Sequence, residues 1–223
     1  AVTLGGGNRV TNEGIISATT TNHATGIFGA LGANNNIITS GEISAEVDNS
    51  SGNGLTAAGI RLFNDNNTVE NSGSVSGVVI GNTGRASGIT MEGETNSITN
   101  SNTIKATFNG TSGRADGVRL IGEETSFNND GEVTAVNIAT SDDTDTAESN
   151  AAGAYLESSD DVDTDISNIG SIEATSNANS TGGGLALAFS DGIDTHAEDD
   201  IENSTIDNSN TIKAEATSEG DLA

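Results

Sequence analysis

The chain has 223 residues, a formal net charge of −26 and only 3% aromatic residues, and it contains no cysteine and no proline. The lack of cysteine excludes disulfide bonds and thiolate metal sites, and so acidic a protein repels nucleic acid and anionic lipid, so we expect neither as a partner. Its apolar runs are shorter than the roughly 20 residues that a helix needs to cross a bilayer, and we expect no membrane insertion.

The sequence repeats a three-part pattern seven times, in units of about 30 residues. The first part is a short phrase in which a small residue leads into alternating apolar positions. Its copies, in chain order, are AVTL from Ala1, GIFG from Gly26, GIRL from Gly59, GITM from Gly88, GVRL from Gly117, GAYL from Gly153 and GLAL from Gly184.

The second and third parts follow each copy of the first. The second is marked by a single apolar residue, in chain order Val10, Ile37, Val69, Ile98, Phe127, Ile166 and Ile206. The third is a seven-residue phrase: NEGIISA from Asn12, TSGEISA from Thr39, NSGSVSG from Asn71, NSNTIKA from Asn100, NDGEVTA from Asn129, NIGSIEA from Asn168 and NSNTIKA from Asn208. The apolar residues that align within this phrase are Ile16, Ile43, Val75, Ile104, Val133, Ile172 and Ile212.

Alternating apolar and polar residues predict strands with one buried face. Three short strands cannot bury their apolar faces within one unit, but pairing each strand with its counterpart in the next unit closes a shared core. The sequence therefore predicts an all-β fold: a parallel β-helix, or β-solenoid, of seven triangular coils that forms a single domain over residues 1–223. We expect right-handed coiling from the general preference of parallel crossovers.

Polar and small residues also occupy equivalent places in successive units. One column is Asn12, Thr39, Asn71, Asn100, Asn129, Asn168 and Asn208, and another is Asn8, Asn35, Asn67, Asn96, Thr125, Thr164 and Ser204. Stacked amides can hydrogen-bond along the axis, and asparagine tolerates the left-handed backbone of a sharp corner, so we interpret both columns as structural. A tight inward corner is predicted at Ala24, Ala57, Ala86, Ala115, Ala151 and Gly182.

Phrases such as NSGSVSG followed by ASGITMEG, and NSNTIKA followed by ADGVRLIG, resemble the Asn-x-Gly-x-Ile repeats of bacterial autotransporter-type passenger domains. The resemblance covers essentially the whole chain. It implies a secreted β-helix that serves as a surface adhesin or a matrix component.

A second interpretation is an enzyme, a lyase or hydrolase acting on a polysaccharide, because enzymes of the pectate-lyase kind also use parallel β-helices. Their chemistry needs carboxylates clustered with a basic residue, but most carboxylates lie in the second half of the chain and the first half holds Arg61, Arg85, Arg114 and Arg119. Arg61 and Arg119 should point outward from one sheet, two coils apart, and we interpret them as solvated. We therefore expect no enzymatic activity and assign no catalytic or cofactor-binding residue.

Two further candidate sites are weak. His23 and His196 are far apart in coil number and offer no paired spacing for a metal. Aromatic residues often form platforms for sugars, but no column is evident among Phe28, Phe63, Phe108, Phe127, Tyr155 and Phe189, of which Phe127 should be in the core.

Acidic residues are concentrated in the second half of the chain. Residues 121–223 hold 24 acidic residues and one basic residue, a net charge of −23, and we predict acidic loop insertions near 141–150, 158–165 and 190–200. Such loops supply the oxygen ligands that Ca²⁺ prefers, although the EF-hand pattern and the GGxGxD repeat of calcium-binding β-rolls are missing. The fold requires no cofactor, and two interpretations stay open: solvated loops, or Ca²⁺ sites formed by Asp142, Asp143, Asp145, Asp160, Asp161, Asp163, Asp165, Asp191, Asp194, Asp199 and Asp200.

The sequence thus favours a secreted or cell-surface, non-enzymatic β-solenoid with an adhesive or structural role on a bacterial surface or in an extracellular matrix. The expected partners are glycans of a host, of a neighbouring cell surface or of the matrix. A stack that begins at Ala1 and ends near Ala214 without a visible cap predicts self-association through the solenoid ends, which would make the protein a subunit of a head-to-tail filament.

Overall fold

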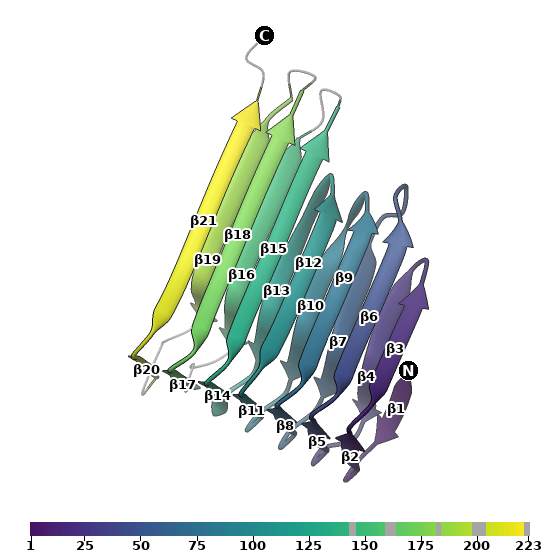
Figure 1. Ribbon diagram of the computed structural model, residues 1–223, viewed down its shortest axis with the longest axis vertical. Coiled ribbons are helices and arrows are strands. Elements are labelled where there is room, and N and C mark those ends of the chain that lie inside the picture. The colour runs from purple at the N-terminus through teal and green to yellow at the C-terminus, as the bar shows by residue number, and fades with distance from the viewer. Residues whose placement is uncertain (143–145, 159–163, 182–183, 198–203, 221–223) are drawn as a thin grey trace.

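The computed structural model describes residues 1–142, 146–158, 164–181, 184–197 and 204–220, and it is the predicted parallel β-helix. Its 21 described strands form three parallel sheets of seven strands each, so the chain makes seven coils (Figure 1). In the part of the chain that the structure describes, there is no helix long and apolar enough to span a membrane.

Each coil contributes one strand to each sheet. Sheet A consists of β1 (Val2–Gly5), β4 (His23–Leu31), β7 (Leu55–Phe63), β10 (Thr83–Glu92), β13 (Ser112–Ile121), β16 (Ala147–Ser158) and β19 (Ala186–Ala197). Sheet B consists of β2 (Arg9–Asn12), β5 (Asn36–Thr39), β8 (Thr68–Asn71), β11 (Ser97–Asn100), β14 (Thr125–Asn129), β17 (Thr164–Asn168) and β20 (Thr205–Asn208). Sheet C consists of β3 (Ile15–Thr20), β6 (Glu42–Asn49), β9 (Ser74–Gly81), β12 (Thr103–Gly110), β15 (Glu132–Ser141), β18 (Ser171–Ser180) and β21 (Thr211–Gly220).

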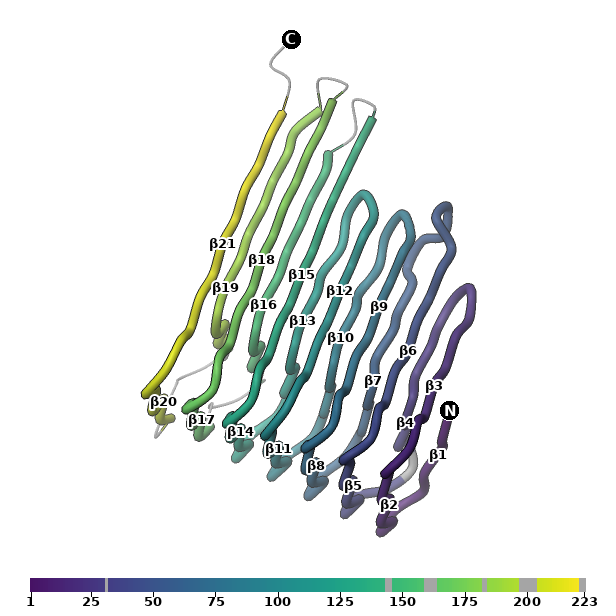
Figure 2. The backbone as a smooth tube through the Cα atoms, viewed as in Figure 1, coloured from purple at the N-terminus to yellow at the C-terminus, as the bar shows by residue number. Residues whose placement is uncertain are grey.

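The three sides of the coil are unequal. Sheets A and C are wide and lie face to face, and the short strands of sheet B close one edge between them (Figures 1 and 2). The cross-section is therefore a flattened wedge, because strands of four or five residues cannot hold the two wide sheets apart along their whole length.

The strand register confirms the predicted apolar columns of sheets B and C. In sheet B, Val10 pairs with Ile37 and the column continues through Val69, Ile98, Phe127, Ile166 and Ile206. In sheet C, Ile16 pairs with Ile43 and the column continues through Val75, Ile104, Val133, Ile172 and Ile212. Each coil therefore places one branched or aromatic side chain from sheet B and one from sheet C at the same level of the stack.

The prediction for the first part of the seventh unit is wrong. The phrase GLAL from Gly184 does not align with GAYL, because β16 pairs with β19 so that Ala152 lies opposite Asp191 and Ala154 opposite Ile193. The seventh copy is therefore GIDT from Gly192. The same pairing puts Ser190 opposite Ala151, where Gly182 was predicted, and Gly182 lies outside the described residues.

Much of the predicted acidic loops is strand, which corrects the loop interpretation. Ser141 belongs to β15 and pairs with Ser180, residues 147–150 belong to β16, residues 164–165 belong to β17, and residues 190–197 belong to β19. The extra residues lengthen the strands of sheets A and C in the later coils, because backbone groups there can pair with the equally long strands next to them. The remainder, residues 143–145, 159–163 and 198–200, lies outside the described part of the chain.

The core narrows away from sheet B. Next to sheet B it consists of large aliphatic residues from all three sheets, with Phe127 in the sheet B column as predicted. Farther on, where sheets A and C face each other directly, the core is mainly alanine, including the column Ala24, Ala57, Ala86, Ala115 and Ala151. Small side chains there let the two sheets approach. The five alanines point inward as predicted, but the predicted corner is wrong, because they lie within β4, β7, β10, β13 and β16.

The asparagine columns form hydrogen-bonded ladders, as predicted. Asn71 Nδ2 donates to Asn100 Oδ1 at 2.7 Å, and the same 2.7 Å bond repeats from Asn100 to Asn129, from Asn129 to Asn168 and from Asn168 to Asn208. In the second column, Asn8 donates to Asn35, Asn35 to Asn67 and Asn67 to Asn96.

The left-handed backbone predicted for these asparagines falls on other residues. Positive φ occurs one residue before the second column, at Asn34, Asn66, Thr95 and Glu124. The column residue keeps ordinary backbone angles because its amide must point along the axis, and the preceding residue makes the corner.

Candidate functional site: a groove on sheet A

The outer face of sheet A is indented along the solenoid axis. In β7 the four consecutive residues Ala57 to Ile60 are all buried, and the corresponding residues of β13 and β16 are buried as well, so the usual alternation breaks. Glycine makes this possible: a Cβ on Gly59 would lie 2.6 Å from Val75 Cγ1 of sheet C. The strands dip toward the core at this point and leave a shallow groove on the outside.

The strand register defines the groove. Its floor is the column Thr25, Ala58, Ser87, Asp116, Ala152 and Asp191. One wall is the column His23, Thr56, Arg85, Arg114, Asn150 and Phe189, and the other is Phe28, Arg61, Thr90, Arg119, Tyr155 and Asp194. Four of the seven basic residues of the chain therefore line one groove. The aromatic residues Phe28 and Tyr155 share one wall and lie four coils apart.

Arg61 and Arg119 lie on one sheet, two coils apart, with Thr90 between them, as predicted. Their predicted solvation is wrong for Arg119, whose side chain is only 13% exposed. The groove and the neighbouring acidic side chains bury it: its Nη2 lies 3.1 Å from Glu157 Oε2 and its Nη1 lies 3.7 Å from Glu92 Oε1.

Glu92 joins the two arginines of this wall. Its Oε1 also accepts a 3.1 Å hydrogen bond from Arg61 Nη2, so one carboxylate lies between guanidinium groups of β7 and β13. Both arginines nevertheless keep a buried Nε–H without an acceptor among the described residues. A buried donor left unpaired costs about 1–3 kcal/mol, and Asp116 Oδ2 in the floor is a buried acceptor that also lacks a hydrogen bond among the described residues, so the groove holds unsatisfied groups of both kinds.

Asp116 is a fully buried carboxylate in the groove floor. Arg114 Nε donates to its Oδ1 at 2.6 Å, and Arg85 Nε lies 3.2 Å from its Oδ2. Burial raises the pKa of Asp116 above its ordinary value, and the guanidinium groups of Arg114 and Arg85 oppose that shift. Because Asp116 has no exposed surface, its role is to fix the two arginines of the first wall in place.

Tyr155 packs against the same cluster. The guanidinium carbon of Arg114 lies 3.9 Å from the centre of the Tyr155 ring, and that of Arg119 lies 5.5 Å from it. Both distances are within the range of cation–π attraction. Burial and the charge of Glu157 raise the pKa of the Tyr155 hydroxyl, so the ring stays neutral at ordinary pH.

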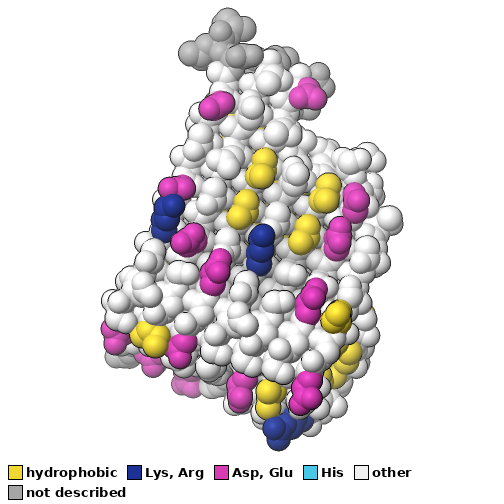
Figure 3. All heavy atoms as spheres, viewed as in Figure 1, with side chains coloured by type: hydrophobic (Ala, Val, Ile, Leu, Met, Phe, Trp, Pro, Cys, Tyr) yellow, Lys and Arg dark blue, Asp and Glu magenta, His cyan; other side chains and the backbone are white. Residues whose placement is uncertain are grey.

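The groove contains two hollows. The first has a volume of about 130 Å³ and is lined by residues of β4, β7, β10 and β13, including Arg61, Arg85 and Arg119. The second has a volume of about 220 Å³ and is lined by Arg114, Asn150, Ala151, Phe189, Asp191 and Asp194. The face formed by sheet C differs from this, because its charged and apolar side chains are scattered among uncharged polar ones (Figure 3).

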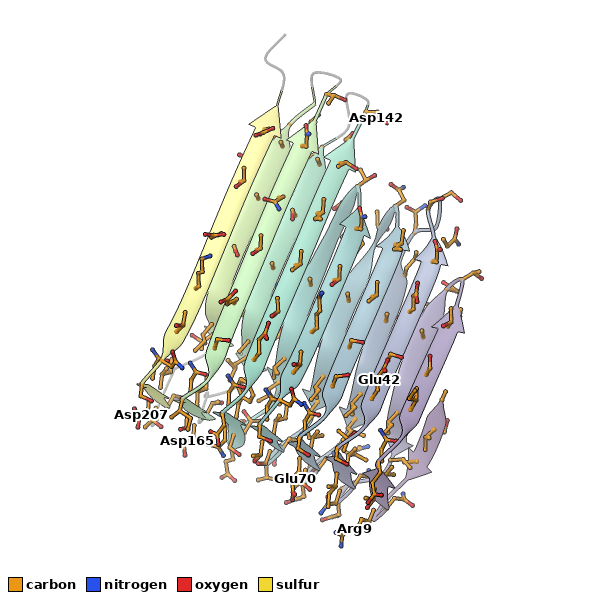
Figure 4. The ribbon with its side chains drawn as sticks, in the orientation of Figure 1. Arg9, Glu42, Glu70, Asp142, Asp165 and Asp207 are labelled. Atoms are coloured by element: carbon orange, nitrogen blue, oxygen red, sulfur yellow. The ribbon has the colours of Figure 1, made fainter. Side chains whose placement is uncertain are left out.

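The predicted Ca²⁺ ligands do not assemble within the described residues. Seven of them, Asp143, Asp145, Asp160, Asp161, Asp163, Asp199 and Asp200, lie outside the described part of the chain. Asp142 lies at the edge of the coil opposite to Asp165 (Figure 4), and Asp191 and Asp194 lie on β19 in the groove. Among the described residues, no group of three or more histidine, aspartate or glutamate side chains is placed to hold a metal ion.

Asp191 and Asp194 take part in the groove instead. Asp194 Oδ2 lies 3.4 Å from Arg114 Nη2. Burial and the nearby charge of Asp194 raise the pKa of Asp191, against a smaller opposing effect of Arg114. The two histidines lie far apart, as predicted. His23 is on β4, with its Nδ1 2.8 Å from Thr56 Oγ1, and His196 is on β19.

The sequence contained a signal for the groove that its interpretation missed. Arg85 and Arg114 both stand three residues before the glycine of the first part, and Arg61 and Arg119 both stand two residues after it. That spacing places each pair in one column. The sequence alone did not indicate Asp116 or Tyr155, because their importance depends on how far the strands dip.

No family model, curated protein or solved structure matches the chain. The proposed function therefore rests on the fold and on the groove of this chain.

Proposed function

We propose that the protein is a non-enzymatic β-solenoid that binds glycans through the sheet A groove, as an adhesive or structural element of a bacterial surface or extracellular matrix. The observation that carries the proposal is the fixed arginine cluster: Arg61, Arg85, Arg114 and Arg119 line one groove and are held by carboxylates. Guanidinium groups held in this way are suited to binding polar ligands with little loss of side-chain entropy.

Binding fits these residues better than catalysis does. A general acid or base must reach the proton that it transfers, and Asp116, the most deeply buried carboxylate of the groove, has no exposed surface. The repeat pattern that resembles autotransporter-type passenger domains supports a secreted or cell-surface location. A rigid stack with a lateral groove suits a protein that holds on to a polymer.

The proposal is tested by exposing the purified chain to arrays of bacterial and host surface glycans and to the same glycans in solution. We expect retention on some of the glycans and no shortening of any of them, with Ca²⁺ or with a chelator. Release of oligosaccharides by the purified protein would overturn the non-enzymatic part of the proposal, and lack of retention on every glycan would overturn the binding part.

A polysaccharide-active enzyme, a lyase or hydrolase, is the second candidate. The observation that favours it is the second hollow, where Asp191 and Asp194 lie beside Arg114 and the pKa of Asp191 is raised. If the chain does cleave a glycan, Asp191→Asn should abolish cleavage, and Asp130→Asn, which removes an equal charge from an exposed corner, should not.

Self-association through the solenoid ends remains part of the proposal. The described stack has one open edge at β1, β2 and β3 and another at β19, β20 and β21. Ile206 and Ile212 are 54% and 37% exposed, whereas Ile166 and Ile172, one coil earlier, are 2% and 0% exposed. A further coil would cover them, and a second copy of the chain is one source of it.

Electron microscopy of the purified 223-residue chain over a range of salt and Ca²⁺ concentrations tests this association. We expect filaments, because the nearly neutral first half of one copy can meet the acidic second half of another. Short single rods under every condition would exclude association by the chain alone.

A further inference from the structure

Three guanidinium groups converge on the first hollow of the groove. Arg61, Arg85 and Arg119 come from three consecutive coils and line the same cavity of about 130 Å³. Pockets for drug-sized molecules have volumes of about 300–1,000 Å³, so this hollow suits a single small group that projects from a larger ligand.

The arginine side chains that line the hollow can only donate hydrogen bonds. Arg61 Nε and Arg119 Nε are buried and lack an acceptor among the described residues. Arg85 makes an ion pair with Asp116 through Nε, and no hydrogen bond joins its terminal nitrogens to the described side chains. A ligand that meets these groups must supply acceptors, and an oxyanion supplies the strongest ones.

The geometry favours a carboxylate. Arg61 and Arg119 stand on either side of Thr90 in one wall, and Arg85 stands across the floor residue Ser87 in the other wall. A planar carboxylate between two walls can accept from guanidinium groups on both sides, and hydrogen bonds between ionised groups are about twice as strong as neutral ones. Glu92, from this same chain, already occupies that kind of position between Arg61 and Arg119.

The remaining lining is suited to a sugar. Thr25, Thr56, Ser87 and Thr90 bring hydroxyl groups to the hollow, and a hydroxyl can both donate to and accept from a sugar hydroxyl. Phe28 and Phe63 form an edge-to-face pair with ring centres 5.9 Å apart, and Arg61 lies 4.7 Å from the centre of the Phe63 ring. This pair adds an apolar surface at the margin of the hollow, next to Arg61.

We propose that the first hollow binds the carboxylate of a uronate residue in an acidic polysaccharide, with Arg61, Arg85 and Arg119 as the anion-binding residues. The proposal rests on the glycan-binding function proposed above and names the chemical class of the glycan. The net charge of −26 repels a long polyanion, and Arg61, Arg85 and Arg119 are already paired with Glu92, Asp116 and Glu157, so the hollow offers hydrogen-bond donors and no excess of positive charge. Binding therefore depends on contact in the groove and not on long-range attraction.

The test is isothermal titration calorimetry of the full chain with a tetrasaccharide of galacturonate, in 0.15 M salt with a chelator. At this salt concentration the Debye length is about 8 Å, so repulsion between more distant charges is largely screened. The chelator removes bridging by Ca²⁺. We expect one tetrasaccharide to bind per chain. The methyl ester of the same tetrasaccharide should bind about tenfold to hundredfold more weakly, because it loses charged hydrogen bonds.

Two variants assign the binding to the hollow. Arg119→Gln removes one anion-binding group, and Ala58→Leu fills the hollow from its floor while it keeps all four arginines of the groove. Each should weaken tetrasaccharide binding about tenfold or more. Arg9→Gln is the matched control: it changes the net charge by the same amount as Arg119→Gln, but Arg9 is exposed on β2 of sheet B.

The outcomes separate this proposal from the proposed function. Equal binding of the tetrasaccharide by the wild type and by a folded Ala58→Leu protein would overturn the assignment to the hollow. Equal binding of sodium sulfate, or tighter binding of an oligoglutamate, would overturn the uronate. Retention on neutral glycan arrays without any uronate binding would overturn this proposal and leave the glycan-binding function standing.

Discussion

Ile104 and Lys105 are consecutive residues of β12 whose side chains lie on opposite faces of sheet C. Ile104 is fully buried between Val75 and Val133 of the neighbouring coils, and Lys105 is exposed. One step along the chain therefore changes the environment from the centre of the core to water.

Ile104→Asp should destabilise the stack by several kcal/mol, because it places an unpaired carboxylate among aliphatic side chains. Lys105→Asp should have a much smaller effect. Thermal melts of the two variants measure the difference. Equal stabilities would contradict the assigned faces of β12.

The amide ladder should be sensitive to the loss of a single member. Asn129 accepts from Asn100 and donates to Asn168, both at 2.7 Å, so Asn129→Ala removes the donor to Asn168 Oδ1 and one of the three acceptors of Asn100 Nδ2. We expect a loss of about 1–3 kcal/mol in the free energy of unfolding, measured in urea. The neighbouring exposed residue provides the control, and Asn128→Ala should change stability by less than about 0.5 kcal/mol.

The raised pKa of Asp191 predicts a pH-dependent effect of Asp191→Asn. Burial and the charge of Asp194 disfavour the ionised carboxylate in the folded state, so the wild type loses stability as pH rises through the raised pKa. Asp191→Asn should therefore melt at a higher temperature than the wild type at neutral pH. The difference should vanish below the ordinary pKa of about 3.8, where the wild-type carboxyl is protonated in both states.

Asp130→Asn serves as the comparison for that experiment, because it removes the same charge from an exposed corner. A gain in melting temperature as large as that of Asp191→Asn would show that the effect comes from net charge. A difference between Asp191→Asn and the wild type that persists below pH 3.8 would contradict the role of ionisation.

Ca²⁺ should stabilise the C-terminal half of the chain, where the net charge of residues 121–223 is −23. Calorimetric melts with Ca²⁺, with Mg²⁺ and with NaCl at matched ionic strength separate coordination from screening. A larger shift with Ca²⁺ than with the other two indicates bound Ca²⁺, and equal shifts with all three contradict the prediction.

The architecture of the solenoid could be predicted from the sequence alone. In sheets B and C, one apolar residue per coil recurs with fixed spacing to the next, as from Val69 to Val75 and from Ile98 to Ile104. Each of these apolar positions has the same packing environment in every coil, so the repeat predicts the register of the fourteen strands of sheets B and C. The asparagine columns were visible for the same reason.

The last coil and the groove could not be predicted in this way. Two phrases, at Gly184 and at Gly192, compete for the first part of the seventh unit, and only the pairing of β19 with the lengthened β16 decides between them. The burial of Arg119 depends on the dip of the strands at glycine and on neighbours such as Glu157, 38 residues away in sequence. When extra residues lie between two coils, the residues that contact each other across those coils are no longer a constant number of positions apart in the sequence.

The two amide ladders give the solenoid an internal direction. In both columns, each amide-to-amide bond has its Nδ2 donor in the earlier coil and its Oδ1 acceptor in the later one. The side-chain dipoles are therefore aligned, and hydrogen bonds in such a row polarise and strengthen one another. A coil that joined the stack upside down would present donor to donor, so the ladders select the sense in which any new coil can be added.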